Sequence, residues 1–140
     1  MKLERLFEVK DSRLYSVGGA EVPVTPDMVK TVKWSEVETS PESYDEAFLA
    51  NLRDELKKLE DEKKFVVIEP VVDKDDGFEP FTAAMCHTAR RIKDCVSVIG
   101  FAVPENFVNN AVSYMEELSK KHLHYCFFSR TKFSKNVCVI

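Results

Sequence analysis

The chain has 140 residues, of which 44% are hydrophobic and 31% charged, and its formal net charge at pH 7 is −4. This balance is typical of a globular domain that buries its own core, and it excludes a disordered chain or a disulfide-stapled miniprotein. The basic residues are dispersed among acidic ones, which argues against nucleic acid as a partner. No segment has the pattern of a signal peptide or a membrane span, so we expect a cytoplasmic protein with no membrane partner.

The first 27 residues predict a β-hairpin followed by a lead-in to the core. Two short strands are expected at Leu6–Val9 and Arg13–Val17, joined by a turn at Lys10–Ser12. Gly18 and Gly19 mark a second turn, where a positive φ is easily adopted. The opening of the chain is therefore expected to be antiparallel.

Residues 28–130 alternate short apolar runs with longer amphipathic segments. We predict strands at Val29–Trp34, Phe65–Val72, Val96–Val103 and Leu123–Phe128. The segments between them are long enough for helical crossovers, which return the chain to the same end of the sheet and so favour parallel pairing. The runs are almost continuously apolar, as in strands buried on both faces. The core is thus expected to be an α/β sheet of about four parallel strands with flanking helices.

Helices are expected between these strands. The spacing of Ser43 and Glu46 matches a capping box and predicts that the first helix begins near Ser43. The second is expected from about Glu79 to Lys93, with an apolar stripe at helical intervals. The third begins near Pro104 or Glu105, and its last turn carries positive charge that complements the helix dipole.

The last ten residues, 131–140, predict an edge strand at Val137–Ile140. Together with the hairpin region 1–27 and the core 28–130, they are expected to form a single α/β domain spanning residues 1–140. Two arrangements of the core stay open at this point. The sheet is either a half-barrel or an open doubly wound sheet.

Parallel sheets bind ligands at the carboxyl ends of their strands, so the residues there are the candidates for a functional site. Those residues are Ser35, Glu36, Glu69, Asp73, Pro104, Glu105, Ser129 and Arg130. Glu69 directly follows a buried run, where a shielded carboxylate serves as a general acid or base, and an ion pair with Lys33, Arg130 or a loop lysine is the alternative. Glu105 has the same two readings, with stabilisation of a helix start as a third.

Other chemistry has weaker support in the sequence. The acidic loop Asp73–Glu79 departs from a calcium loop, because Ala84 stands where the twelfth position needs a glutamate, and a solvated turn is the simpler interpretation. No phosphate loop or dinucleotide fingerprint is present, so we expect no metal and no cofactor. The four cysteines lack CxxC spacing and are interpreted as reduced. Trp34 is either an aromatic platform for a sugar ring or part of the core.

The order of elements resembles the first half of cellulase-like glycoside hydrolases with a (β/α)₈ barrel. After the hairpin, the resemblance is carried by Val29–Trp34, Leu59–Lys64, Phe65–Ile68 and Ala89–Phe101, and it covers most of this chain. It implies a barrel-like sheet, a carbohydrate ligand and a catalytic role for Glu105. The family places its acid/base glutamate in an Asn-Glu-Pro sequence, whereas this chain has Pro104-Glu105-Asn106, and the family's nucleophile lies on a seventh strand.

These departures favour a glycoside-hydrolase-like module that is catalytically incomplete and acts in ligand binding or assembly. The alternative is a glycosidase with Glu69 and Glu105 as its acid pair, completed by a second copy of the chain in a homodimer. A retaining mechanism needs two such carboxylates roughly 5 Å apart. In both readings the residues expected to contact the ligand are Trp34, Glu36, Asp73 and Arg130.

Overall fold

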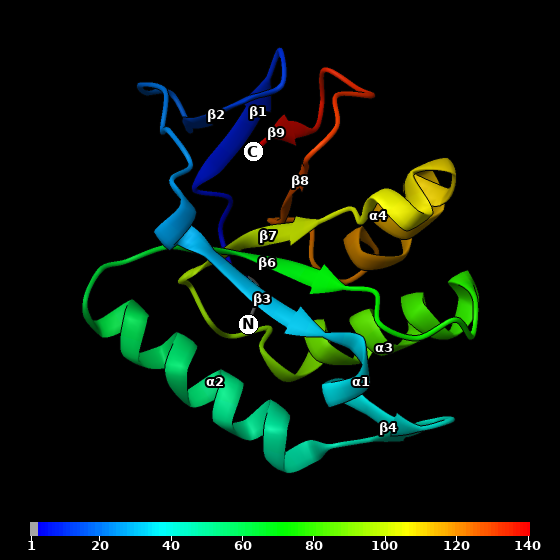
Figure 1. Ribbon diagram of the computed structural model, residues 1–140. Coiled ribbons are helices and arrows are strands. Elements are labelled where there is room, and N and C mark those ends of the chain that lie inside the picture. The colour runs from blue at the N-terminus through cyan, green and yellow to red at the C-terminus, as the bar shows by residue number, and fades with distance from the viewer. Residues whose placement is uncertain (1–2) are drawn as a thin grey trace.

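The computed structural model of the protein describes residues 3–140. Its centre is a five-stranded, entirely parallel sheet with the order β3-β6-β7-β8-β9 (Figure 1). Its strands are β3 (Val29–Lys33), β6 (Val66–Val71), β7 (Val98–Ala102), β8 (Cys126–Ser129) and β9 (Cys138–Val139). The parallel sheet is confirmed, and the carboxyl-terminal segment adds its fifth strand.

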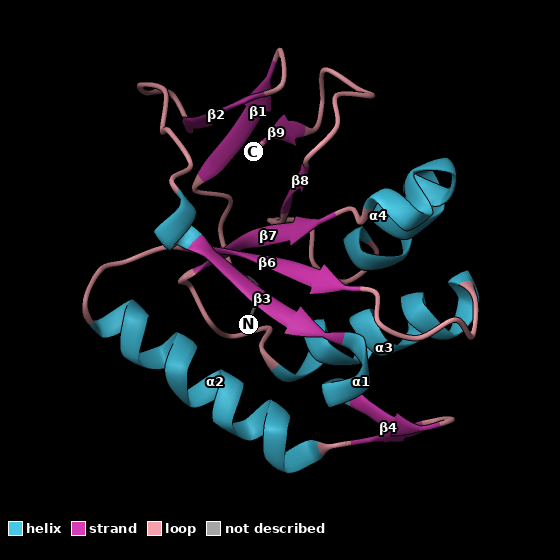
Figure 2. Ribbon diagram, in the orientation of Figure 1, coloured by secondary structure: helices cyan, strands magenta, loops and turns pink. Residues whose placement is uncertain are grey.

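Spatial neighbours in this sheet follow one another in chain order, with no reversal. The connections between parallel strands are right-handed, and here each one leads to the next strand in the same direction across the sheet. All of their helices therefore lie on one face of the sheet. Three helices, α2 (Glu46–Asp61), α3 (Phe78–Arg91) and α4 (Ala111–Ser119), share one hydrophobic core, and Figure 2 shows them on the side of the sheet away from the amino-terminal hairpin. The doubly wound alternative is therefore wrong, and the sheet has the sequential order of a half-barrel.

The expected amino-terminal hairpin is confirmed as β1 (Phe7–Lys10) paired with β2 (Arg13–Ser16). Asp11 and Ser12 at its turn have φ values of 51° and 64°, the left-handed backbone that a two-residue hairpin turn of the favoured twist requires. Leu14 of β2 is 1% exposed and belongs to a second core on the sheet face opposite the helices. The hairpin is thus what covers that face.

Two elements between β3 and the first long helix were not expected from the sequence. One is the single-turn helix α1 (Trp34–Val37), and the other is a small antiparallel pair of β4 (Glu38–Ser40) and β5 (Ser43–Tyr44). Ser43 is therefore in a strand, and the predicted helix start there is wrong.

The first long helix, α2, runs from Glu46 to Asp61. Asp45 caps it, because its carboxylate accepts a hydrogen bond from the Phe48 amide at 3.0 Å. Leu49, Leu52 and Leu56 are its buried residues. The apolar stripe that predicted this helix therefore faces the core, although the cap lies two residues after Ser43.

The remaining helices complete the layer. Helix α3 spans Phe78–Arg91, close to its expected bounds. The third expected helix consists of a 3-10 segment, η2 (Glu105–Asn110), followed by α4 (Ala111–Ser119). A further 3-10 turn, η1 (Pro26–Met28), leads into β3. Within residues 3–140, no helix combines the length and the apolar composition needed to cross a membrane.

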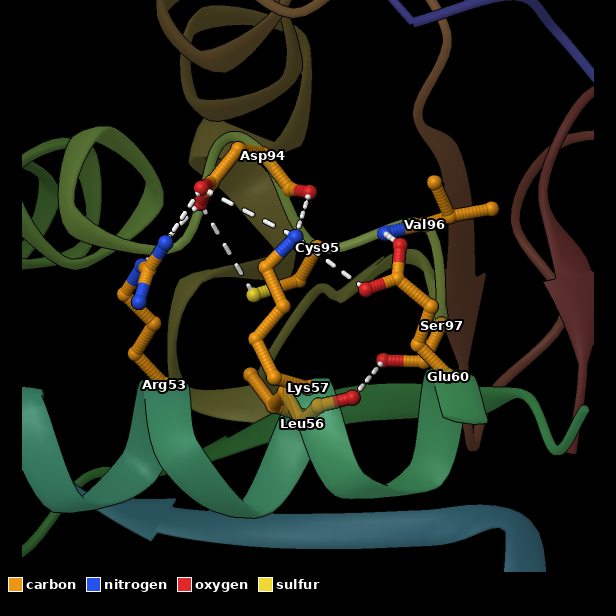
Figure 3. Close-up of polar contacts among 8 residues, drawn as sticks. All are labelled: Arg53, Leu56, Lys57, Glu60, Asp94, Cys95, Val96 and Ser97. Carbon is orange, nitrogen blue, oxygen red and sulfur yellow. Dashed lines mark hydrogen bonds and ion pairs between the residues drawn. The ribbon is translucent and has the colours of Figure 1, made fainter. Parts of the chain in front are cut away.

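Polar contacts fasten α2 to the loop that leads into β7 (Figure 3). The guanidinium of Arg53 hydrogen-bonds both carboxylate oxygens of Asp94, and this bond holds the pKa of Asp94 below its usual value. Lys57 Nζ donates to the Asp94 carbonyl at 2.7 Å, and the buried Ser97 hydroxyl donates to the Leu56 carbonyl at 2.7 Å. Asp94 thus binds Arg53 and Lys57, and Ser97 binds Leu56, so these contacts have a structural role.

Candidate functional site

The carboxyl ends of three neighbouring strands bring two predicted site residues into direct contact. Glu69 lies in β6 and Arg130 directly follows β8, while β7 runs between these strands. Arg130 Nε donates to Glu69 Oε2 at 2.9 Å, and its terminal nitrogen donates to Glu69 Oε1 at 2.8 Å. The resulting bidentate pair bridges the end of β7. Its two parallel hydrogen bonds fix the orientation of both side chains.

Glu105 lies beside this pair at the start of η2. Its Oε1 accepts a hydrogen bond from the Thr131 hydroxyl at 2.9 Å. The pKa of Arg130 is raised chiefly by the hydrogen bonding that it donates to Glu69, and the negative charges of Glu69 and Glu105 add to that effect. Glu69, Glu105, Arg130 and Thr131 therefore form one group, which we call the carboxyl-edge cluster.

This geometry bears on the two readings of Glu69. Both of its oxygens accept hydrogen bonds from Arg130, as the ion-pair reading predicts. A general acid or base needs an oxygen that reaches the substrate proton. While the pair is formed, each oxygen of Glu69 is bonded to a guanidinium nitrogen and keeps only its remaining lone pair for a ligand hydroxyl. The catalytic role expected of it has no support from this arrangement.

Asp73 lies at the same edge but serves to join two loops. Its carboxylate accepts hydrogen bonds from both the amide and the hydroxyl of Ser35, the amide at 2.9 Å. Burial acts to raise the pKa of Asp73, but the hydrogen bonds from Ser35 outweigh it and the pKa is lowered. Glu36, the next residue, is exposed. Within residues 3–140, neither Asp73 nor Glu36 forms a hydrogen bond or ion pair with the carboxyl-edge cluster, so the predicted ligand contacts are not all gathered in one place.

Trp34 is not at a ligand surface. Its side chain is 0% exposed, because α1 turns the ring into the helical layer, where it packs edge-on against Phe81 with ring centroids 5.5 Å apart. Its indole nitrogen donates to Glu38 at 2.8 Å. The expectation of an aromatic platform for a sugar is therefore wrong, and the core reading of Trp34 holds.

Glu38 is a buried charge that sequence reasoning missed. It is 3% exposed, and its carboxylate accepts hydrogen bonds from Trp34, from the Glu42 amide at 2.8 Å and from Lys74 at 3.1 Å. Burial acts to raise the pKa of Glu38, but these three donors outweigh it, so the pKa is lowered. Nothing in the polar stretch around Glu38 signals burial, since the contact with Lys74 is made across 36 residues of sequence.

The acidic loop after β6 has the conformation of a turn. Gly77 has a φ of 98° and precedes α3, and Lys74 lies 3.3 Å from Asp76. Among residues 3–140, no three histidine, cysteine, aspartate or glutamate side chains are grouped so as to hold a metal ion. The loop is thus accounted for by its glycine and its ion pair.

The carboxyl-edge cluster offers a ligand a mixture of hydrogen-bond donors and acceptors on an open surface. The Arg130 side chain is 50% exposed and that of Glu69 is 20% exposed. An ion pair at this exposure stays accessible to solvent, so polar groups of a ligand can bind to it. Searches of this chain against family models, curated proteins and solved structures found no match.

Proposed function

We propose that this protein is a noncatalytic ligand-binding module resembling a glycoside-hydrolase half-barrel, and that its carboxyl-edge cluster binds a carbohydrate. The observation that carries the proposal is the bidentate pair of Arg130 and Glu69 at 2.8 and 2.9 Å. It supports binding over catalysis, because it preorganises donors and acceptors while it occupies the carboxylate that catalysis requires.

The chemistry of the cluster suits a polyhydroxylated ligand. Sugar hydroxyls both donate and accept hydrogen bonds. They match the carboxylate acceptors of Glu69 and Glu105 and the remaining donors of Arg130. The cluster lies at the end of the sheet where parallel α/β folds bind their ligands. The sequential strand order also supports the resemblance to a barrel half, since a barrel adds its strands in chain order.

Binding is tested by titrating ¹⁵N-labelled protein with cellopentaose and following the amide resonances. We expect saturable shifts at Glu69, Glu105, Arg130 and Thr131. The Arg130→Gln variant should bind about tenfold more weakly, because it loses a charged hydrogen-bonding group. Arg91→Gln is the matched control, since Arg91 also pairs with a glutamate, Glu46, at 2.8 Å but on the helical layer. Shifts that are absent, or equal weakening in both variants, would refute the proposal.

The alternative is a glycosidase whose site a second copy completes, and one observation favours it. Glu105 accepts its hydrogen bond from Thr131 through Oε1 alone, so Oε2 is the oxygen that a substrate would meet. Under our proposal, hydrolysis of aryl glycosides stays at background. Turnover that drops about 10²-fold or more in Glu105→Gln, with the melting temperature unchanged, establishes the enzyme instead. Sedimentation equilibrium on the same sample then shows whether a dimer carries the activity.

A further inference from the structure

The groove between the last turns of α3 and α4 is strongly basic. It has a volume of about 530 Å³. Five basic side chains line it, namely Arg90, Lys93, Lys120, Lys121 and His122. The acid among its lining residues is Glu117, which is paired with Lys120 at 2.8 Å. In a chain with a net charge of −4, this concentration of positive charge is a local feature, which we call the basic groove.

The basic groove is separate from the carboxyl-edge cluster. Helices α3 and α4 end at Arg91 and Ser119, and each then leads to the amino end of the next strand, β7 or β8 (Figure 1). The groove therefore lies toward the amino ends of the strands, while the carboxyl-edge cluster lies at their carboxyl ends. A ligand in the groove would leave the proposed carbohydrate surface uncovered.

The groove has more positive charges than its own ion pairs neutralise. Cations are favoured near helix carboxyl ends, which accounts for some of them. Arg90, Lys93 and Lys121 are nevertheless exposed, and none of the ion pairs within residues 3–140 includes them. Because cations held this close repel one another, an anion placed among them is stabilised.

His122 is the second and independent observation. Its side chain is 8% exposed and lines the groove, yet its ring nitrogens make no hydrogen bond within residues 3–140. Burial, with smaller contributions from His124 and from the positive charges of Lys93, Arg90 and Lys121, lowers the pKa of His122 to about 4. The ring is therefore neutral near pH 7, with an N–H that has no partner in the protein.

We propose that the basic groove binds a small polyanion with two or more phosphate groups. Arg90 offers a planar fork, Lys93 and Lys121 offer point charges, and the unpartnered N–H of His122 offers a neutral donor. The volume lies within the range of about 300–1,000 Å³ that is usual for small-molecule sites. The net charge of the chain is −4, and its other basic residues are dispersed among acidic ones, which favours a small molecule over nucleic acid.

Inorganic pyrophosphate is the probe, titrated into ¹⁵N-labelled protein at constant ionic strength. We expect saturable shifts at Arg90, Lys93, Lys121 and His122. The Lys93→Gln/Lys121→Gln variant should raise the dissociation constant about tenfold or more. A matched control, Lys58→Gln/Lys135→Gln, removes the same charge from exposed positions outside the groove and should leave the constant unchanged.

Three outcomes would overturn this proposal. The first is the absence of saturable shifts in the groove. The second is equal weakening in both double variants, which would indicate a general charge effect. The third is tighter binding of a single-stranded oligonucleotide than of pyrophosphate to the same residues, which would assign the groove to nucleic acid. Exposed lysines are not needed for folding, and the melting temperatures of the two double variants check this.

Discussion

Two ionisable residues show how this chain accommodates polar groups in its interior. Glu38 keeps its charge, because Lys74, the Trp34 indole and the Glu42 amide all donate hydrogen bonds to it. His122 has no such partner, and burial among cations holds it neutral. Both outcomes avoid an uncompensated buried charge, which would be costly. They have the same consequence for acid, because the folded protein lowers the pKa of both groups and protonation of either one therefore favours the unfolded state.

The stability of the protein should therefore depend on His122 in mildly acidic solution. Unfolded His122 binds its proton near the ordinary pKa of 6.5, whereas folded His122 binds it only near pH 4. Between these pH values the unfolded state holds more protons, so the free energy of unfolding falls as the pH is lowered from 6.5 to 4. The contribution of His122 is up to about 3 kcal/mol. The pKa of His124 is also lowered by burial, so it acts in the same direction.

Urea denaturation at several pH values in this window measures the effect. The His122→Gln variant should show a shallower fall in unfolding free energy than the wild type. Leu123→Gln is the control, since Leu123 is 65% exposed and carries no titratable group. An unchanged slope in His122→Gln would show that the ring is protonated in the folded protein.

At the scale of elements, strand β8 approaches β7 most closely at Gly100. A Cβ built on Gly100 would lie 1.7 Å from the Cys126 carbonyl oxygen, and Gly100 pairs with Cys126 in the parallel ladder. The obstacle is backbone, which cannot move aside as a side chain does. This glycine is therefore required by a close approach of two strands, and its φ plays no part.

Gly100→Ala should lower the free energy of unfolding by about 3 kcal/mol or more, because the two central strands must separate. Thermal and urea melts followed by circular dichroism measure this. Gly19→Ala is the control, since its Cβ would lie 3.3 Å from the nearest atom, the side-chain Cβ of Ser16, and a change within about 1 kcal/mol is expected. A wild-type melting temperature in Gly100→Ala would mean that β7 and β8 are further apart than described.

The elements that the sequence predicts well are those with a strong local pattern. The apolar runs locate β3, β6, β7 and β8, and the stripe of α2 locates its buried face. The predicted start of α2 at Ser43 rests on the capping-box spacing. In the structure Ser43 instead belongs to β5, which pairs with β4, and the sequence has no local signal for this pairing. Helix α1 is also missed, because a helix of a single turn is too short to show a periodic pattern of apolar residues.

The candidate site is predictable only as far as topology determines it. A parallel sheet places the residues after its strands at one edge, and this brings Glu69, Glu105 and Arg130 together. Whether two of them form an ion pair depends on side-chain geometry across β7, for which the sequence has no signal. The burial of Trp34 likewise depends on α1, so reading it as an exposed ring fails.

For the whole molecule, the sheet separates two hydrophobic cores that share its strands. One lies under α2, α3 and α4 and contains Trp34, and the other lies under the hairpin and contains Leu14. Consecutive residues of a strand point to opposite faces, so each central strand contributes to both cores. Ile68 and Val67 of β6 are one such pair, with both side chains 0% exposed. Loss of either core should therefore destabilise the strands that the other core needs.

Leu14→Ala tests this coupling, because Leu14 belongs to the hairpin core and Trp34, the single tryptophan, reports on the helical core. We expect a loss of about 2–5 kcal/mol from burial and cavity formation. If the two cores unfold together, the tryptophan fluorescence and circular dichroism transitions coincide and both shift to lower urea. Val17→Ala, at a hairpin position that is 53% exposed, should leave both in place within about 0.5 kcal/mol. A fluorescence midpoint that stays at its wild-type value in Leu14→Ala would mean that the hairpin melts independently and that the sheet is held by its helical face alone.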